Sequence, residues 1–324
     1  MARLLEINNL RTYFYTSRGI VRAVDGVNLA VQKGELAGLV GESGCGKTMT
    51  AFSVMRLVPP PGRIVGGEVW LDLGEERTDL TKLSEAEMRK IRGAVISMVF
   101  QDPMTYLNPV MKISDQVGEN LVLHQGINRN EARKRAIEIL ENVRMPSAAT
   151  VARYYPHQLS GGMRQRALIA MAISCNPELL IADEPTTALD VTVQAQVLQL
   201  IKTIKQDLGM ALMLITHDLG IVADICDRVF VMYAGRIVEE GSVYDIYREP
   251  KHPYTVALLK STLSIDEFKE TLVTVEGSVP DLTSPPEGCR FHPRCPFMMD
   301  KCRTMEPPSI EAGDGRKVSC WLYA

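Results

Sequence analysis

Residues 41–48 of this 324-residue chain read Gly-Glu-Ser-Gly-Cys-Gly-Lys-Thr, which fits the phosphate-binding pattern G-x-x-x-x-G-K-[ST] at every fixed position. The glycines permit backbone conformations in which successive N–H groups turn inward and form an anion-binding nest. Lys47 supplies a point charge for the outer phosphates, and Thr48 offers a hydroxyl to Mg²⁺. The apolar run Leu36–Val40 predicts a buried strand before the loop, and Met49–Leu57 predicts a helix after it. This order of elements makes a chance glycine turn a poor explanation.

The composition is that of an ordinary globular protein, with 46% hydrophobic and 23% charged residues. The length predicts two or three structural units. The net charge of −3 provides no global basic field for nucleic acid. The apolar stretches are shorter than the ~20 residues of a membrane helix, and the early charges Arg3, Glu6 and Arg11 are unlike a signal peptide. We therefore expect a cytoplasmic protein, which could still sit on a membrane through partners.

Strand patterns lie on both sides of the phosphate loop. Leu4–Phe14 and Val21–Val31 alternate loosely and predict strands, the first near a sheet edge. Val229–Tyr233 and Arg236–Glu240 predict a hairpin. Three aromatic residues upstream of the loop could each stack on a nucleotide base or simply pack the sheet, namely Tyr13, Phe14 and Tyr15.

From residue 113 to residue 174 the pattern changes to helices, with no clear strand. Glu131–Val143 has charged and apolar residues at helical spacing. Within this region Leu159–Arg166 reads LSGGMRQR, where Ser160 and two glycines precede the apolar helix predicted at Met163–Ser174. A helix N-terminus can bind phosphate, although a Ser-Gly-Gly cap taken alone is more often only a helix start. The region predicts a helical insertion into an α/β chain.

Two carboxylates follow a short buried strand. Leu179–Ala182 predicts that strand, and Asp183 and Glu184 come directly after it, where open α/β sheets bind ligands. We expect Asp183 in the Mg²⁺ shell and Glu184 to orient and polarise an attacking water, and we consider two solvated charges the weaker alternative. The predicted strand Ala211–Ile215 places His217 at the same edge, although a lone histidine there is more often structural.

Taken in order, these motifs closely resemble the ATP-binding subunit of an ABC transporter. The resemblance spans about residues 4–240 and rests on GESGCGKT, Gln101, LSGGMRQR, LLIADE ending at Glu184, ALD ending at Asp190, and His217. Two further stretches resemble the dipeptide/oligopeptide importer branch, namely HPYT at His252–Thr255 and GCRFHPRC at Gly288–Cys295.

The resemblance implies a role for each matching residue. Glu184, His217 and Gln101 would be catalytic, with Gln101 near the metal and His217 on the γ-phosphate. Phe14 is the expected adenine-stacking residue, with Tyr13 second. The Mg²⁺ ligands would be Thr48, Gln101 and Asp183. The nucleotide-binding residues would be Phe14, Gly41, Glu42, Ser43, Gly44, Cys45, Gly46, Lys47, Thr48, Gln101 and Asp183, together with Ser160, Gly161 and Gly162.

Two details of this resemblance concern the partner and the loop. Ser160, Gly161 and Gly162 would complete the ATP site of a partner subunit rather than this chain's own site. Asp190 would lie across the same interface. Cys45 stands where serine is usual in the family, and we expect little effect because that side chain is not needed for phosphate contact.

Four of the seven cysteines crowd into the proline-rich tail with the spacing Cys-x5-Cys-x6-Cys-x17-Cys. In a cytoplasmic chain such a cluster suggests metal before disulfides. Zinc sites usually have short C-x2-4-C pairs, so this wider spacing favours an iron–sulfur cluster over zinc. The importer branch implies a [4Fe–4S] cluster, and we expect a structural role in a tail with little core, with a regulatory role left open. Its ligands would be Cys289, Cys295, Cys302 and Cys320.

The expected fold is an α/β P-loop NTPase (RecA-like) core with an antiparallel β edge subdomain, an inserted α-helical subdomain and a C-terminal Cys-rich extension. Residues 1–103 and 175–245 would form the nucleotide-binding core with its β subdomain. Residues 104–174 would form the helical signature subdomain, and residues 246–324 the importer-specific domain.

The resemblance implies an ATPase that powers import of dipeptides or oligopeptides by closing against a second, homologous ATPase subunit. Two transmembrane permeases and an extracytoplasmic substrate-binding protein would complete the machine, and the chain would lie peripherally on the cytoplasmic face of the cell (inner) membrane. Nickel complexes or oligosaccharides are alternative cargoes. A non-transport ABC ATPase acting on ribosomes or DNA is disfavoured by the single ATPase unit and the absence of a basic patch. Intact Glu184 and His217 disfavour a non-catalytic scaffold.

Overall fold

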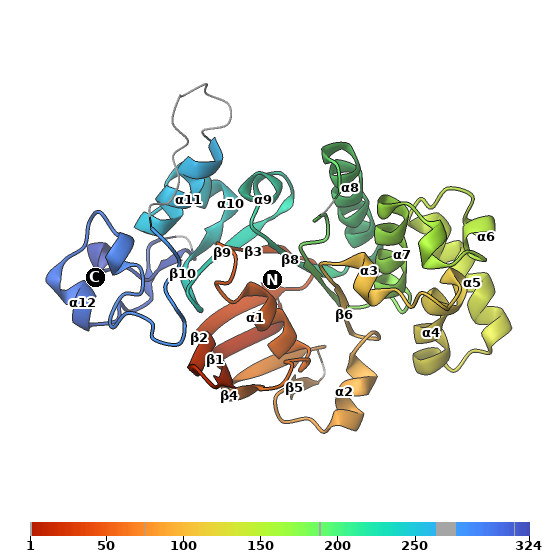
Figure 1. Ribbon diagram of the computed structural model, residues 1–324, viewed down its shortest axis with the longest axis horizontal. Coiled ribbons are helices and arrows are strands. Elements are labelled where there is room, and N and C mark those ends of the chain that lie inside the picture. Colours follow the sequence, from red (N-terminus) through yellow and green to blue (C-terminus); the bar gives the residue numbers. More distant parts are fainter. Residues whose placement is uncertain (1, 75, 188, 264–276, 314) are drawn as a thin grey trace. The chain divides into compact units, whose positions relative to one another are not determined.

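The computed structural model describes residues 2–74, 76–187, 189–263, 277–313 and 315–324 (Figure 1). The chain divides into two compact units, and each mixes strands with helices. The first unit consists of Met1–Ala2, Gln32–Glu35 and Leu83–Met213, and the second of Arg3–Val31, Leu36–Lys82 and Leu214–Ala324. Strand β8 (Ala211–Thr216) begins in the first unit and ends in the second.

A four-stranded antiparallel sheet, in the order β2-β1-β4-β5, occupies the second unit. Apolar residues face each other across β1 and β4, where Leu5 lies opposite Leu71 and Ile7 opposite Val69, and all four are buried. This alternation buries one face of the sheet. The strands are β1 (Arg3–Thr16), β2 (Gly19–Gln32), β4 (Gly62–Asp72) and β5 (Arg77–Asp79), so the predicted strands at residues 4–14 and 21–31 are confirmed. The edge position expected for the first strand is taken by β2, because β1 pairs with β2 on one side and with β4 on the other.

The second unit also contains the strand that leads into the phosphate loop. Strand β3 (Leu36–Val40) is buried along its whole length and pairs in parallel with β9 (Arg228–Tyr233). The predicted hairpin is confirmed, since β9 pairs antiparallel with β10 (Arg236–Ser242). Helix α1 (Lys47–Val54) follows the loop but ends before the predicted Leu57, because Arg56 takes a left-handed conformation with φ 50°.

The C-terminal region extends this β structure, which the proline-rich sequence did not predict. Strand β12 (Lys317–Val318) pairs with β10, and β11 (Ile310–Glu311) pairs with β12. Phe291 is 2% exposed and belongs to a core formed with residues of β3, β9 and β10 and with helical residues such as Leu219, Ile246 and Tyr254. The tail therefore has a hydrophobic core that it shares with the sheet. The remaining helical elements of the second unit are α9 (Leu219–Ile225), α10 (Val243–Arg248), α11 (Pro253–Leu263), η2 (His292–Arg294), α12 (Asp300–Thr304) and η3 (Trp321–Tyr323).

The first unit combines a parallel strand pair with the helical region. Strands β6 (Ile96–Val99) and β7 (Leu179–Asp183) are parallel and fully buried. Residues 113–174 contain helices and no strand, as predicted. Helix α2 (Glu85–Ile91) begins with a capping box formed by Ser84 and Glu87. The other helical elements are α3 (Pro103–Tyr106), α4 (Ile113–Gln125), α5 (Arg129–Asn142), α6 (Ala148–Val151), η1 (Pro156–Gln158), α7 (Gly161–Ile173) and α8 (Val191–Leu208).

The described part of the chain contains no helix that is long and apolar enough to span a lipid bilayer.

Candidate active site

The phosphate loop of the second unit is a tight turn closed by its own lysine. Gly46 has φ 111°, and a Cβ atom there would lie 2.2 Å from the Ala23 carbonyl oxygen, so only glycine fits. Lys47 is 6% exposed, and its Nζ donates to the carbonyl oxygens of Gly41 at 2.7 Å and Glu42 at 3.1 Å. The ammonium thus lies inside the loop, and the exposed residues Ser43 and Gly44 form its outer edge. A tight glycine-containing turn around a positive charge suits an anion.

The side chain of Cys45 lies in the interior, with its Sγ 3.9 Å from Lys47 Nζ. It is fully buried, and burial raises the pKa of its thiol even though the Lys47 charge acts in the opposite direction. The Cys45 carbonyl oxygen accepts a hydrogen bond from the Gly235 N–H at 2.7 Å. This placement is consistent with the expectation that the change from serine has little effect on phosphate contact.

The carboxylates of the first unit gather with Gln101 at one edge of the strand pair. Because β6 and β7 are parallel, Gln101 and Glu184 both follow the carboxyl ends of neighbouring strands. Gln101 Nε2 donates to Glu184 Oε2 at 3.0 Å, and Thr187 Oγ1 donates to the same oxygen at 2.9 Å. Asp183, which ends β7, is 2% exposed. The structure thus brings together three of the predicted site residues: Gln101, Asp183 and Glu184.

The backbone of Glu184 is in a conformation that is uncommon for a side chain of its size. Its φ of 45° lies in the left-handed region, which costs a non-glycine residue free energy and is concentrated at functional sites. The two hydrogen bonds to Oε2 hold the carboxylate in one orientation. A carboxylate fixed in this way is a suitable base for a water molecule in front of it.

The LSGG segment begins a helix at the surface of the first unit. Ser160 caps α7, and its side chain accepts from the Met163 N–H at 3.4 Å. Gly161 is exposed, and at Gly162 a Cβ atom would lie 2.8 Å from a methyl carbon of Val193. Asp190 caps α8 by accepting from the Val193 N–H at 2.9 Å. The first-turn N–H groups of α7 therefore lie at an exposed end, where an anion can approach.

The aromatic candidates and His217 belong to the second unit. Tyr13 donates its hydroxyl hydrogen to Asp25 at 2.6 Å, so this ring is held within the sheet. Phe14 is half-buried beside Gly62, where a Cβ atom would lie 2.6 Å from the Phe14 ring. Tyr15 is 48% exposed. His217 follows β8 and is exposed.

Sequence reasoning missed the contacts between the phosphate loop and the C-terminal region. The Glu42 carboxylate accepts from both terminal nitrogens of Arg294, at 2.9 and 3.0 Å, and the Glu42 N–H donates to the Tyr254 hydroxyl oxygen at 2.9 Å. Asp25 forms an ion pair with buried Arg290, whose other terminal nitrogen donates to the Ala234 carbonyl oxygen. HPYT and GCRFHPRC contain Tyr254, Arg290 and Arg294, and they were the only signal of these contacts.

The HPYT segment is organised around buried polar groups. The N–H groups of Lys251 and His252 donate to the carboxylate of Glu239 at 2.8 and 2.9 Å. His252 Nδ1 accepts from the Tyr254 N–H at 3.0 Å, which caps α11. Burial lowers the pKa of His252 to about 3. The ring is therefore neutral, and Nδ1 is the acceptor nitrogen.

We predict that protonation of His252 destabilises the second unit below pH 6.5. The unfolded state binds this proton near pH 6.5, whereas the folded state does so only near pH 3, so stability present above pH 6.5 is lost as the pH falls. Lowering the pH from 7.5 to 5.5 should reduce the free energy of unfolding by about 1.4 kcal/mol, measured by urea denaturation. The His252→Gln variant should lose this dependence. An equal pH slope in both proteins would contradict the prediction.

The expectation that four cysteines hold a [4Fe–4S] cluster is wrong. Among the described residues, which include all four of these cysteines, no group of three or more His, Cys, Asp or Glu side chains could hold a metal ion. Burial raises the pKa of the Cys289 thiol to about 11 and also raises the pKa values of Cys295 and Cys320. The tail is held instead by its shared core and by backbone pairing, such as the Cys289 N–H to the Cys302 carbonyl oxygen at 2.9 Å.

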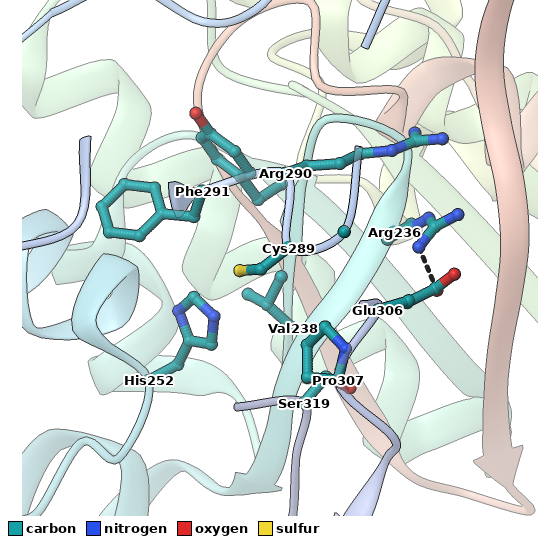
Figure 2. Close-up of a pocket in the computed structure, with 11 residues that line it drawn as sticks. Arg236, Val238, His252, Cys289, Arg290, Phe291, Glu306, Pro307 and Ser319 are labelled. Carbon is teal, nitrogen blue, oxygen red and sulfur yellow. Dashed lines mark ion pairs between the residues drawn. The ribbon is translucent and has the colours of Figure 1, made fainter. Parts of the chain in front are cut away.

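A small cavity lies beside Cys289, next to the neutral ring of His252 (Figure 2). Its volume is about 30 Å³, which accommodates roughly two water molecules but no substrate. The other three tail cysteines do not line it. The lining residues are Tyr233, Arg236, Val238, His252, Gly288, Cys289, Arg290, Phe291, Glu306, Pro307 and Ser319.

A phosphate loop, a strand-end carboxylate pair and an exposed LSGG helix start define an ATPase of the ATP-binding cassette class. Residues 24–187 match the family described as ABC transporter, and residues 238–302 match the one described as Oligopeptide/dipeptide transporter, C-terminal region. The chain belongs to the ABC transporter family as an ATP-binding subunit whose C-terminal region is of the oligopeptide/dipeptide transporter type. The predicted ABC cassette fold around a P-loop NTPase core is thereby confirmed.

Similar proteins match over nearly their whole length. The chain is 51% identical over 324 residues to the oligopeptide transport ATP-binding protein AppD of Bacillus subtilis (strain 168), covering 100% of this chain and 98% of the relative. It is 48% identical over 323 residues to the dipeptide transport ATP-binding protein DppD of the same organism, covering 99% and 95%. The dimeric, post-hydrolysis ATP-binding cassette MJ0796 bound to ADP and Pi has a TM-score of 0.66 at 29% identity, covering 74% of this chain and 99% of that one.

Proposed function

We propose that this ATPase powers the import of dipeptides or oligopeptides through a membrane complex. The observation that carries the proposal is the C-terminal region of the oligopeptide/dipeptide transporter type, joined to a chain in which the phosphate loop, Glu184 and His217 are all present. The names of the relatives, which describe oligopeptide and dipeptide transport, support the same cargo. The chain would act peripherally at the cytoplasmic face of the membrane, on two permease subunits.

In this proposal the active assembly contains a second, homologous ATPase subunit. The exposed start of α7 supports it, because Ser160, Gly161 and Gly162 would present N–H groups to a nucleotide held by the partner. The domain boundaries of this proposal are residues 1–103 with 175–245 for the core and its β subdomain, 104–174 for the helical subdomain and 246–324 for the importer-specific domain. Closure of the two subunits requires that ATP bind the closed state more tightly than the open one.

Each residue of the site would have a distinct task. The N–H groups and charge of Gly41–Thr48 would hold the phosphates, and Phe14 would stack on adenine. Thr48, Gln101 and Asp183 provide oxygen atoms, which suit Mg²⁺. When bound, MgATP supplies the phosphoanhydride bond that is cleaved. Glu184 would accept the proton of the attacking water, and His217 would stabilise charge on the terminal phosphate.

Purification of the complex tests this function. The chain should co-purify with two permeases, and its ATPase activity in vesicles should rise when the cognate capture protein is supplied with a peptide. Stimulation by an oligosaccharide or a nickel complex, with no response to peptides, would contradict the proposed cargo. Isolation with ribosomes or DNA in place of permeases would contradict transport altogether.

A further inference from the structure

Glu42 places a carboxylate inside a loop that would bind polyphosphate. A negative charge at this point repels the nucleotide unless another group neutralises it. Within the second unit this group is Arg294, whose two terminal nitrogens donate to Glu42 Oε2 and Oε1 at 2.9 and 3.0 Å. The Arg294 side chain is 5% exposed and that of Glu42 25% exposed. Bidentate pairing of a nearly buried arginine fixes both the charge and the direction of the carboxylate.

Glu42 is also held through its backbone N–H group. The Glu42 N–H donates to the Tyr254 hydroxyl oxygen at 2.9 Å, so this N–H points to α11. Tyr254 is fully buried, and its ring centroid lies 4.6 Å from that of Tyr233 and 5.5 Å from that of Phe291. The guanidinium of Arg294 lies 5.7 Å from the Tyr233 ring and also donates to its hydroxyl oxygen at 3.3 Å. Arg294 and Tyr254, the two residues that hold Glu42, therefore both belong to or contact one aromatic cluster, formed by Tyr233, Tyr254 and Phe291.

We propose that Arg294 and Tyr254 are positioning residues for the phosphate loop, through which the C-terminal region sets the affinity of this chain for MgATP. Arg294 neutralises the Glu42 carboxylate and directs it away from the bound phosphates, and Tyr254 fixes the path of the backbone at Glu42. The inference rests on the proposed role of Gly41–Thr48 in nucleotide binding. The proposal assigns the HPYT segment, through Tyr254, and the GCRFHPRC segment, through Arg294, a role in nucleotide binding.

Variants that remove one charge or both distinguish neutralisation of Glu42 from a purely structural ion pair. If the Arg294–Glu42 pair only held the tail in place, removal of either partner would have the same effect, and removal of both would not help. If Arg294 neutralises Glu42, Arg294→Gln should weaken MgATP binding about tenfold, whereas Glu42→Gln, which leaves the positive charge of Arg294 unopposed, should shift the affinity in the opposite direction. The double variant Glu42→Gln/Arg294→Gln should then recover most of the wild-type affinity.

Nucleotide charge provides a second readout. MgATP carries one more negative charge than MgADP, so Arg294→Gln should weaken binding of MgATP more than binding of MgADP, and high salt should reduce the difference. General loosening of the fold would weaken both nucleotides equally. Tyr254→Phe keeps the ring and removes the acceptor for the Glu42 N–H, and it should raise KM for ATP with little change in kcat.

The experiment is calorimetric titration of the full chain with MgATP and MgADP at low and high salt. Arg303→Gln is the matched control, because Arg303 is an exposed arginine of α12 in the same tail. Arg294→Lys, which keeps one charge without the bidentate geometry, should show an intermediate loss and covers the case in which Arg294→Gln does not fold. Wild-type affinity in both Arg294 variants, or no rescue by Glu42→Gln, would overturn the inference and leave the proposed nucleotide site intact. A wild-type chain that does not bind MgATP would overturn both.

Discussion

Replacing Glu184 by glutamine is expected to lower ATP turnover by about 10²–10⁴-fold while MgATP binding stays intact. The variant keeps the size of the side chain and an oxygen that can accept from Gln101 and Thr187, the two donors that hold Oε2. It removes the carboxylate basicity that would take a proton from water. The left-handed backbone of Glu184 tolerates glutamine as well as it tolerates glutamate, because both side chains leave Cβ unbranched.

The measurement uses the purified transport complex, in which the equivalent carboxylate of the partner ATPase is replaced in every sample, so that only this chain's site turns over. Phosphate release gives the rate, and titration with MgATP gives the affinity. Glu178→Gln is the matched control, because Glu178 is an exposed glutamate just before the other end of the same strand. Hydrolysis at the wild-type rate in the Glu184 variant would remove Glu184 as the base.

The local parts of the site could be predicted because each is continuous in sequence. The strand Leu36–Val40, the loop after it and the start of α1 are determined by neighbouring residues, and so is the strand that ends at Asp183. Gln101 and Glu184 meet for a simple reason: both follow parallel, adjacent strands. The ends of helices were predicted less accurately. The left-handed residue that ends α1 is Arg56, and no glycine in the sequence indicates a turn there.

The C-terminal region could not be predicted in the same way, because its structure depends on residues far apart in sequence. Arg294 meets Glu42, and Phe291 enters a core formed with β3 and β9, through contacts that no local pattern encodes. The iron–sulfur prediction followed from the cysteine spacing and from the resemblance to the importer branch, and the structural role expected of the cluster followed from a proline-rich composition that suggested a tail with little core. Spacing does not determine whether the side chains converge on one point, and among the described residues no group of three or more His, Cys, Asp or Glu side chains could hold a metal ion.

Replacing Lys47 by methionine is expected to weaken MgATP binding by about 10–100-fold, because one charged donor that can make two hydrogen bonds is lost. In this structure Lys47 Nζ donates to the carbonyl oxygens of Gly41 and Glu42, which places the ammonium inside the cradle. Methionine has a similar length and an apolar stem, so the buried volume stays filled. Equilibrium titration of the full chain gives the affinity, and Lys33→Met, at an exposed lysine just before β3, is the matched control.

Lys47→Arg tests whether any positive charge is sufficient. Lys47 is 6% exposed inside the loop, and a guanidinium is larger and planar, so it cannot occupy the position of a compact ammonium without displacing the loop backbone. The arginine variant should therefore bind MgATP nearly as weakly as the methionine variant. Wild-type binding by Lys47→Arg would show that charge alone is needed, and wild-type binding by Lys47→Met would remove Lys47 from the phosphate site.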